Sequence, residues 1–270
     1  MKYENFEYEL RDGAAFVTLV TPDADTLGDL CDEWVDLLLR LQEEPQARVI
    51  LLSDGLRPFD LSPGLETLAE LRCAGNDFSE LAPQLENARR VVTAIQEYSK
   101  PIVAAAAGCV REAGFGLFLA ADFRLAADTA TFQAPDAARG LLPEWGLLHN
   151  LPRLIGQSRA LELLWSGRTV SAAEAARIGL IERVVPAARW EEELEALAAR
   201  LAALPQPAVR LLKLAVQQSA LFDFTAMLDL EYEAQQQCWA GPETAEGMAA
   251  FLHGRAPDFT VPSSETADED

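Results

Sequence analysis

The stretch that decides the fold runs from Ser99 to Ile155 and reads SKPIVAAAAGCVREAGFGLFLAADFRLAADTATFQAPDAARGLLPEWGLLHNLPRLI. Its apolar pattern predicts a buried strand over 102–107, a glycine-containing turn, an apolar helix over 114–121 and a short strand over 123–127. Two acidic residues, Asp136 and Glu144, follow on turns, and turns are where chains commonly present functional side chains. The stretch therefore predicts an α/β fold with a candidate site beside these elements.

The flanking segments extend this α/β pattern. Apolar spacing predicts further strands and helices, over 6–10, 14–20, 27–41, 48–53 and 78–98. From residue 187 onward it predicts successive helices and no strand. We expect a core over residues 1–186, a C-terminal helical region over 187–261 and a disordered acidic tail over 262–270.

Length and composition indicate a globular protein that can bury a full core. The chain has 270 residues, of which 50% are apolar. Its longest apolar run, over 102–110, is too short for a membrane span, which needs roughly 18 residues. The first residues, MKYENFEYELRDG, are too acidic for a secretory signal. We expect a cytoplasmic protein with no membrane partner.

The charge balance excludes two classes of partner. The chain has 22 basic and 43 acidic residues, a formal net charge of −21. Nucleic acids and anionic membranes are bound through clustered Lys and Arg, so neither is an expected partner. The same negative charge opposes the binding of an anionic ligand. An acidic surface can also simply serve the solubility of the protein. The four cysteines show no CxxC or Cys/His spacing, so no metal site is expected.

The order of these segments resembles the crotonase family, the enoyl-CoA hydratases and isomerases. The segments SGRTVSAAEAARIGLIERVVP over 166–186 and GMAAFLHGRAPDF over 247–259 are also similar to this family. The resemblance implies a β-β-α spiral core followed by helices that mediate trimers, and hence a homotrimer or a hexamer. It also implies an enzyme that stabilises the enolate of an acyl thioester or related carbonyl compound, with coenzyme A as part of the substrate and no separate cofactor.

Enolate chemistry requires two backbone N–H donors for the developing oxyanion. By the resemblance, one donor maps onto Gly114, at the entrance of the apolar helix; the alternative is a glycine that permits close helix packing. The other donor falls in FDLSPGL, over 59–65, where Pro63 takes the donor position and has no N–H. Loss of one donor costs roughly a hundredfold to a thousandfold in rate. A shift of register by one residue would let Gly64 donate instead.

The acid and base positions are partly retained. The family's hydratases use two glutamates; the first falls on Gly116 and the second on Asp136, so two-carboxylate hydration is not expected. Glu144 matches the catalytic carboxylate of some double-bond isomerases, and we expect its apolar neighbours, including Trp145, to raise its pKa. An isomerase or lyase with Glu144 as acid/base and Asp136 as auxiliary is therefore favoured over a hydratase. The alternatives are a solvated turn residue for Glu144 and a turn or helix N-cap for Asp136.

The remaining candidates are expected to contact substrate. Pro63 and Trp145 are placed at the pocket; His149 either flanks it or is a hydrogen-bonded histidine between leucines. Arg57 and Arg255 are the best phosphate partners for coenzyme A. Two classes of function stay open. The first is an enolate-stabilising enzyme, and the second is a catalytically impaired crotonase-like protein that acts as an oligomer partner or scaffold.

Overall fold

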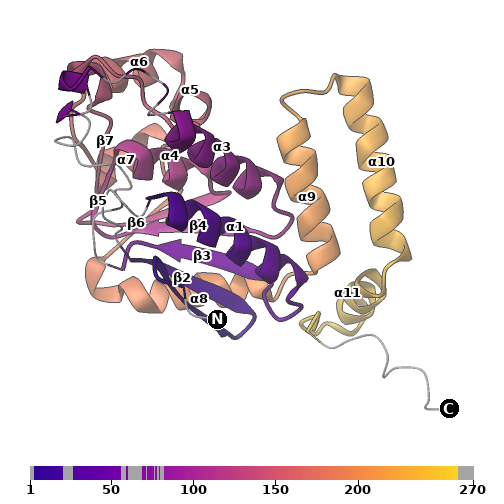
Figure 1. Ribbon diagram of the computed structural model, residues 1–270. Coiled ribbons are helices and arrows are strands. Elements are labelled where there is room, and N and C mark those ends of the chain that lie inside the picture. The colour runs from indigo at the N-terminus through magenta and orange to yellow at the C-terminus, as the bar shows by residue number, and fades with distance from the viewer. Residues whose placement is uncertain are drawn as a thin grey trace.

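The structure is a computed structural model that describes residues 3–20, 27–55, 59, 69–70, 72–75, 77, 79 and 82–260. Figure 1 shows a layered α/β body with three helices that extend from one side of it. The positions predicted for Arg57, Pro63 and Gly64 lie outside the described residues, and so does the tail over 262–270.

A six-stranded sheet forms the centre of the body, in the order β1-β2-β3-β4-β6-β9. Its strands have the bounds β1 Phe6–Arg11, β2 Ala14–Leu19, β3 Val49–Ser53, β4 Ile102–Ala106, β6 Phe123–Ala127 and β9 Arg183–Val185. β1 and β2 pair antiparallel, and every later pair is parallel. All five residues of β4 are buried, as expected for a parallel strand covered on both faces. The strands predicted over 102–107 and 123–127 are confirmed by β4 and β6.

A second, smaller sheet continues the fold beside the first. It consists of β5 Cys109–Arg111, β7 Thr131–Gln133 and β8 Val170–Ser171, in the order β5-β7-β8. Phe59 joins it through a parallel bridge to Val110 and is fully buried. These strands hold two or three residues each, too few for an apolar period, and we did not predict them.

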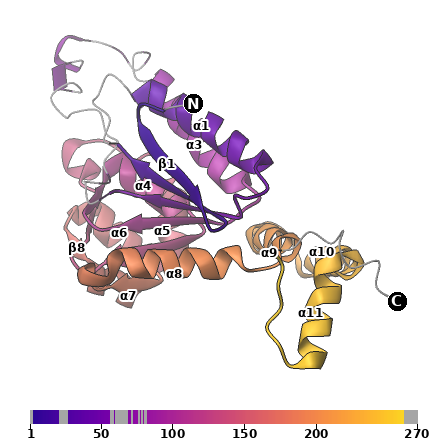
Figure 2. The same cartoon turned by 90° about the horizontal axis from the view of Figure 1, so that it is seen from below.

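Helices cover both faces of the large sheet, as Figure 2 shows. On one face lie α1 Leu27–Glu43 and α3 Ala82–Glu97, which pack on each other. On the other lies α8 Trp190–Ala202, whose apolar side joins a buried cluster with strand residues such as Leu51 and Val103. Because α8 packs on the sheet, the helices that project from the body start after α8. The predicted boundary between core and helical region at residue 187 stays a prediction.

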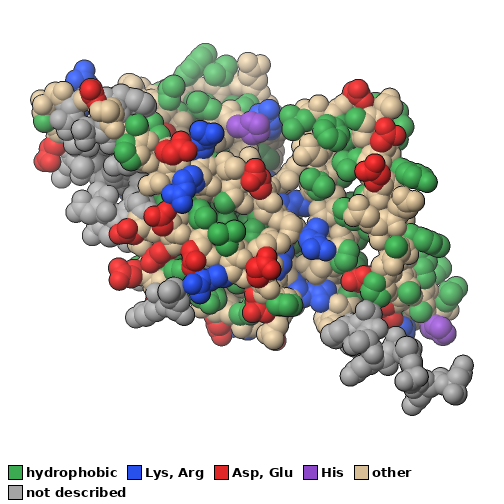
Figure 3. All heavy atoms as spheres, turned by 45° about the vertical axis from the view of Figure 1, so that its right-hand side comes forward, with side chains coloured by type: hydrophobic (Ala, Val, Ile, Leu, Met, Phe, Trp, Pro, Cys, Tyr) green, Lys and Arg blue, Asp and Glu red, His purple; other side chains and the backbone are tan. Residues whose placement is uncertain are grey.

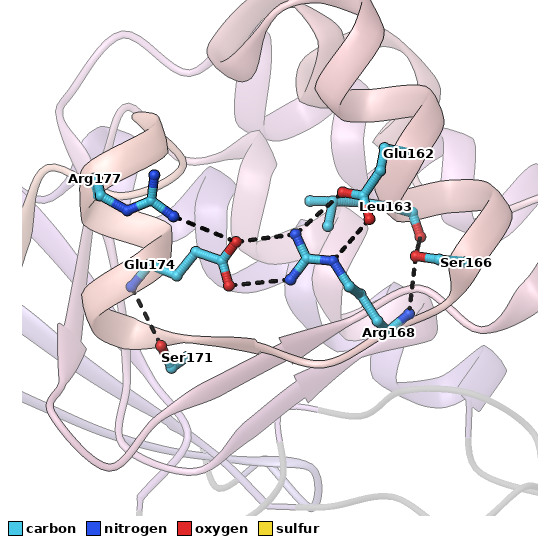
Figure 4. A network of polar contacts seen from close by, with 7 residues as sticks. All are labelled: Glu162, Leu163, Ser166, Arg168, Ser171, Glu174 and Arg177. Carbon is cyan, nitrogen blue, oxygen red and sulfur yellow. Dashed lines mark hydrogen bonds and ion pairs between the residues drawn. The ribbon is translucent and has the colours of Figure 1, made fainter.

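The central helix α4, Glu112–Ala120, is the most buried helix of the body. Every residue from Ala113 to Ala120 is buried. The 3₁₀ helix η3 Asp136–Arg139 and the helices α5 Leu147–Ile155, α6 Gln157–Ser166 and α7 Ala172–Ile178 follow it in the chain. Arg168 ties α6 to α7 through Glu162 and Glu174 (Figure 4). This network joins α6 to α7.

Three helices project from the body: α9 Gln206–Gln218, α10 Phe224–Ala240 and α11 Pro242–His253. The Lys213 ammonium on α9 donates to Asp122 Oδ2 at 2.7 Å, and Arg48 donates to the Phe259 carbonyl at 2.8 Å. In this described part of the chain, α9 and α10 contain no buried residue. Figure 3 shows hydrophobic side chains distributed over this projecting region. No helix among the described residues is long and apolar enough to cross a membrane.

Candidate active site

The two acidic residues singled out from the sequence lie near one another in the structure. Asp136 begins η3, directly after Pro135, and Glu144 lies in the turn that leads into α5. The negative charge of Asp136 is close enough to contribute to raising the pKa of Glu144. Two carboxylates delivered by separate turns are therefore close enough for the charge of Asp136 to act on Glu144.

The turn that carries Glu144 lies directly against position 116 of α4. A Cβ atom at Gly116 would lie 2.5 Å from the Trp145 Cβ and 2.7 Å from the carbonyl oxygens of Glu144 and Trp145. Trp145 is only 4% exposed and has a φ of 55°, a left-handed conformation that is rare for a bulky residue. The absence of a side chain at Gly116 is therefore what lets this turn pack against α4, and no glutamate fits there in this arrangement.

Asp136 is a half-buried carboxylate with a raised pKa. Among the described residues, its Oδ2 is buried without a hydrogen-bond partner. Burial is the main cause that raises the pKa of Asp136, and the Glu112 carboxylate raises it further. A hydrogen bond from the backbone of Asp136 itself and the charge of Arg139 oppose the rise. An unpaired buried carboxylate oxygen costs stability, and such groups in native proteins commonly have a functional reason.

Glu144 combines a raised pKa with access to solvent. Desolvation by the surrounding protein is the main cause that raises its pKa, as expected from its apolar neighbours, and the charge of Asp136 is the second. The residue as a whole is exposed, so its carboxyl group can still exchange protons with water. A carboxyl with a raised pKa is better matched to proton transfer near neutral pH than an ordinary one.

The N-terminus of α4 is the candidate oxyanion site. The helix begins at Glu112, two residues before Gly114, so the Glu112, Ala113 and Gly114 amides all belong to its first turn. First-turn amides and the helix dipole favour a developing negative charge. Glu112 has a φ of 52°, which marks a strained entry into the helix. The second donor predicted for the site, at Pro63 or Gly64, lies outside the described residues.

Glu112 and Arg139 are two site residues that the sequence did not single out. Their side chains form an ion pair that joins the start of α4 to the end of η3, which begins with Asp136. The Glu112 side chain is 15% exposed, whereas that of Arg139 is 30% exposed. The signal for Glu112 was its position two residues before Gly114, and the signal for Arg139 was its three-residue spacing from Asp136, which is too common to indicate a site. The pair links the helix terminus to the Asp136 carboxylate.

An apolar cavity of about 160 Å³ adjoins Asp136. Apart from Asp136 it is lined by apolar residues of the segment before η3, of η3, of the following turn, and of α5 and α6, namely Ala134, Ala137, Leu141, Leu142, Pro143, Leu148, Leu161, Leu164 and Trp165. Two larger hollows lie at the sheet face against α8; Arg11 lines both, and Glu195 lines one of them. Their described lining includes none of the site residues, whereas Asp136 lines the smaller cavity.

Three other predicted contacts have less direct support. Trp145 packs in the main core, so its burial indicates a packing role. His149 is exposed on α5, and its pKa is lowered by desolvation and by Arg153. Arg255 follows α11, where it forms hydrogen bonds of 2.6 and 2.7 Å to Glu246, and Figures 1 and 2 show α11 far from α5. Substrate contacts by these residues stay predictions. Among the described residues, no group of three His, Cys, Asp or Glu is placed to hold a metal ion.

Comparison with known proteins identifies the family. The family model for enoyl-CoA hydratase/isomerase matches residues 9–262. A probable enoyl-CoA hydratase from Mycobacterium bovis is 31% identical over 264 residues, covering 96% of this chain and 99% of the relative. A crotonyl-CoA hydratase from Syntrophomonas wolfei is 29% identical over 267 residues, with coverages of 96% and 99%.

Solved structures agree with this assignment. An enoyl-CoA hydratase from Bacillus anthracis matches with a TM-score of 0.85 at 28% identity, covering 95% of this chain and 99% of that one. A Geobacillus kaustophilus enoyl-CoA hydratase subunit matches with a TM-score of 0.83 at 29% identity, with coverages of 96% and 99%. The fold is thus the crotonase fold, an α/β spiral core followed by helices. The chain belongs to the enoyl-CoA hydratase/isomerase family.

Proposed function

We propose that this protein is an enolate-forming enzyme of the isomerase or lyase type, acting on an acyl-CoA or related carbonyl substrate. The observation that carries the proposal is the contact between Gly116 and the Glu144 turn. The position of the first hydratase glutamate, as the family resemblance assigns it, is filled by the backbone of the turn that presents Glu144. The glutamate that hydratases have at this position of α4 is absent, and the adjoining turn carries Glu144 instead.

In the proposed reaction, Glu144 removes a proton next to the thioester carbonyl and returns it at another carbon of the acyl chain. The first-turn amides of α4, among them that of Gly114, stabilise the enolate oxygen. Asp136 is the auxiliary carboxylate, because its charge raises the pKa of Glu144 toward the range useful for proton transfer. The proton moves between two carbons of one substrate, so no water molecule enters the product.

Hydration makes a demand that this site meets poorly. Water must be activated by one group and the neighbouring carbon protonated by another, and the resemblance assigns these tasks to two glutamates. With Gly116 in place of one of them, crotonyl-CoA should be hydrated slowly, although the names of the relatives include hydratases. The names of these relatives describe their own reactions, and the contact between Gly116 and the Glu144 turn supports a different reaction for this chain.

The test is to incubate the protein with 3-hexenoyl-CoA in D₂O and to follow the products by mass spectrometry. We expect the conjugated isomer, with deuterium incorporated through the enolate, to form faster than any hydroxyacyl product. Hydration of crotonyl-CoA is measured in parallel. A hydration turnover on the order of 10 per second or more, typical of dedicated enzymes, would contradict the proposal.

The second candidate function is a catalytically impaired scaffold. It is favoured by the net charge of −21, which opposes the phosphates of coenzyme A. In that case neither isomerisation nor deuterium exchange above the buffer rate should be found on any acyl-CoA tested. Exchange that depends on Glu144 would exclude it.

We also propose a homotrimer or a hexamer assembled through the projecting helices. Large apolar side chains are exposed on them, including Leu212, Phe224, Tyr232, Trp239 and Phe251. An exposed apolar surface of this kind usually marks an interaction site. Light scattering should give a mass of three or six chains at micromolar concentration, and a stable monomer would contradict this proposal.

A further inference from the structure

The apolar cavity beside Asp136 has a lining suited to one kind of ligand. Leu161 and Leu164 of α6 form its half-buried wall, and Ala137 of η3 lies at its edge. Leu142 and Trp165 are 74% and 73% exposed, so large apolar surface remains at the rim. Hydrocarbon is the ligand chemistry that gains most from such a lining, because it loses contact with water without needing hydrogen bonds.

The cavity reaches one of the two proposed carboxylates and adjoins the turn that carries the other. Asp136 is its one charged lining residue, and the Oδ2 of this side chain is buried without a hydrogen-bond partner among the described residues. The turn residues Leu141, Leu142 and Pro143, which line the cavity, lead directly into Glu144. A substrate whose reacting carbons lie at the two carboxylates can therefore extend its tail into this apolar space.

The cavity volume limits the size of that tail. A volume of about 160 Å³ is close to that of an engineered apolar cavity of about 150 Å³ that binds benzene in another protein. It therefore holds a tail of about six carbons, either a phenyl ring or a short alkyl segment. The additional methylene groups of a longer chain would extend beyond the cavity into water and would add no binding affinity.

We propose that the Ala137, Leu161 and Trp165 cavity is the site for the acyl tail, and that it selects thioesters with a compact apolar tail of about six carbons beyond the reacting carbons. This inference rests on the proposed function, because it takes the acyl-CoA class from there. It adds the size of the preferred acyl group and the residues that set it.

The experiment measures binding, so that it does not depend on turnover. Free coenzyme A and a series of saturated acyl-CoAs, from butanoyl to hexadecanoyl, are titrated into the full-length protein by calorimetry. These thioesters carry no double bond to isomerise or hydrate. We expect affinity to increase about fourfold for each methylene group that enters the cavity, and to become constant once the cavity is filled.

Neighbouring alanines of η3 provide a matched pair of variants. Ala137 and Ala138 are both exposed, and of the two only Ala137 belongs to the lining described for the cavity. Ala137→Leu should move the break in the affinity series to shorter tails, and Ala138→Leu should leave it in place. Leu161→Ala enlarges the cavity and should move the break to longer tails. Circular dichroism and thermal unfolding verify that each variant is folded.

The possible outcomes separate this inference from the proposed function. Equal affinity for coenzyme A and all its thioesters, or an increase that continues through hexadecanoyl, would overturn the tail site and leave the proposed reaction standing. The same shift in the Ala137 and Ala138 variants would overturn it as well. A change of oligomeric mass in Ala137→Leu would assign the cavity to a subunit interface instead. No binding of any acyl-CoA or of coenzyme A would count against the proposed function itself.

Discussion

Replacing Gly116 by alanine tests the contact on which the site depends. In a helix interior, Gly→Ala normally stabilises a protein by about 1 kcal/mol. Here the new Cβ would meet Trp145 Cβ at 2.5 Å and two backbone oxygens at 2.7 Å, and backbone cannot move aside as a flexible side chain does. Overpacking of this kind costs up to about 3 kcal/mol. The net expectation is a destabilisation of about 2 kcal/mol.

A second helical glycine is the matched control. A Cβ at Gly247 of α11 would find the Phe259 ring at 3.7 Å, which is an ordinary contact. Gly247→Ala should therefore stabilise the protein by up to about 1 kcal/mol. In thermal unfolding, Gly116→Ala should lower the midpoint by about 4 to 8 °C, and Gly247→Ala should raise it slightly. If Gly116→Ala is as stable as the parent or follows Gly247→Ala, the proposed contact with the Glu144 turn is wrong.

Three further results are expected. Burial raises the pKa of Asp136 and Glu144 in the folded state, so stability should decline as pH increases from the ordinary carboxyl range through the folded values. The double variant Asp136→Asn/Glu144→Gln should be more stable than the parent at neutral pH but not in acid, as urea unfolding at several pH values will show. Arg139→Ala removes a charge that lowers the pKa of Asp136, so the pH-rate profile should move to higher pH, with partial rescue by Arg139→Lys. Phe224→Glu on α10 should reduce the oligomeric mass in light scattering, whereas Gln236→Glu on the same helix should not.

Much of the framework was predictable because it depends on local apolar pattern. The run over 102–107 and the segment over 123–127 became β4 and β6, since buried parallel strands read as continuous apolar residues. The short strands β5, β7 and β8 were not predictable, because their pairing is set by the tertiary fold. The helix predicted to start at Gly114 starts at Glu112, whose left-handed φ has no sequence signal.

The candidate site was only partly predictable for a related reason. The sequence indicated Asp136 and Glu144 as residues on turns, but their electrostatic coupling depends on how η3 and the α5 turn pack together. Gly116 was visible as a missing glutamate. Only the structure shows why no side chain fits at Gly116, namely that Trp145 and the Glu144 carbonyl occupy the space. The ion pair between Glu112 and Arg139 likewise joins two residues that are 27 positions apart in the chain.

The most direct test of the central claim is the rate of deuterium incorporation into 3-hexenoyl-CoA by carboxylate variants. Glu144→Gln keeps the shape of the side chain and removes its proton transfer, so the account predicts a loss of roughly a hundredfold or more. Asp136→Asn should cost less, and Glu97→Gln, on the exposed side of α3, should change nothing. The opposite result would be a rate for Glu144→Gln within a factor of about three of the parent, together with no exchange in Asp136→Asn. In that case Asp136 is the principal acid/base and the account is wrong.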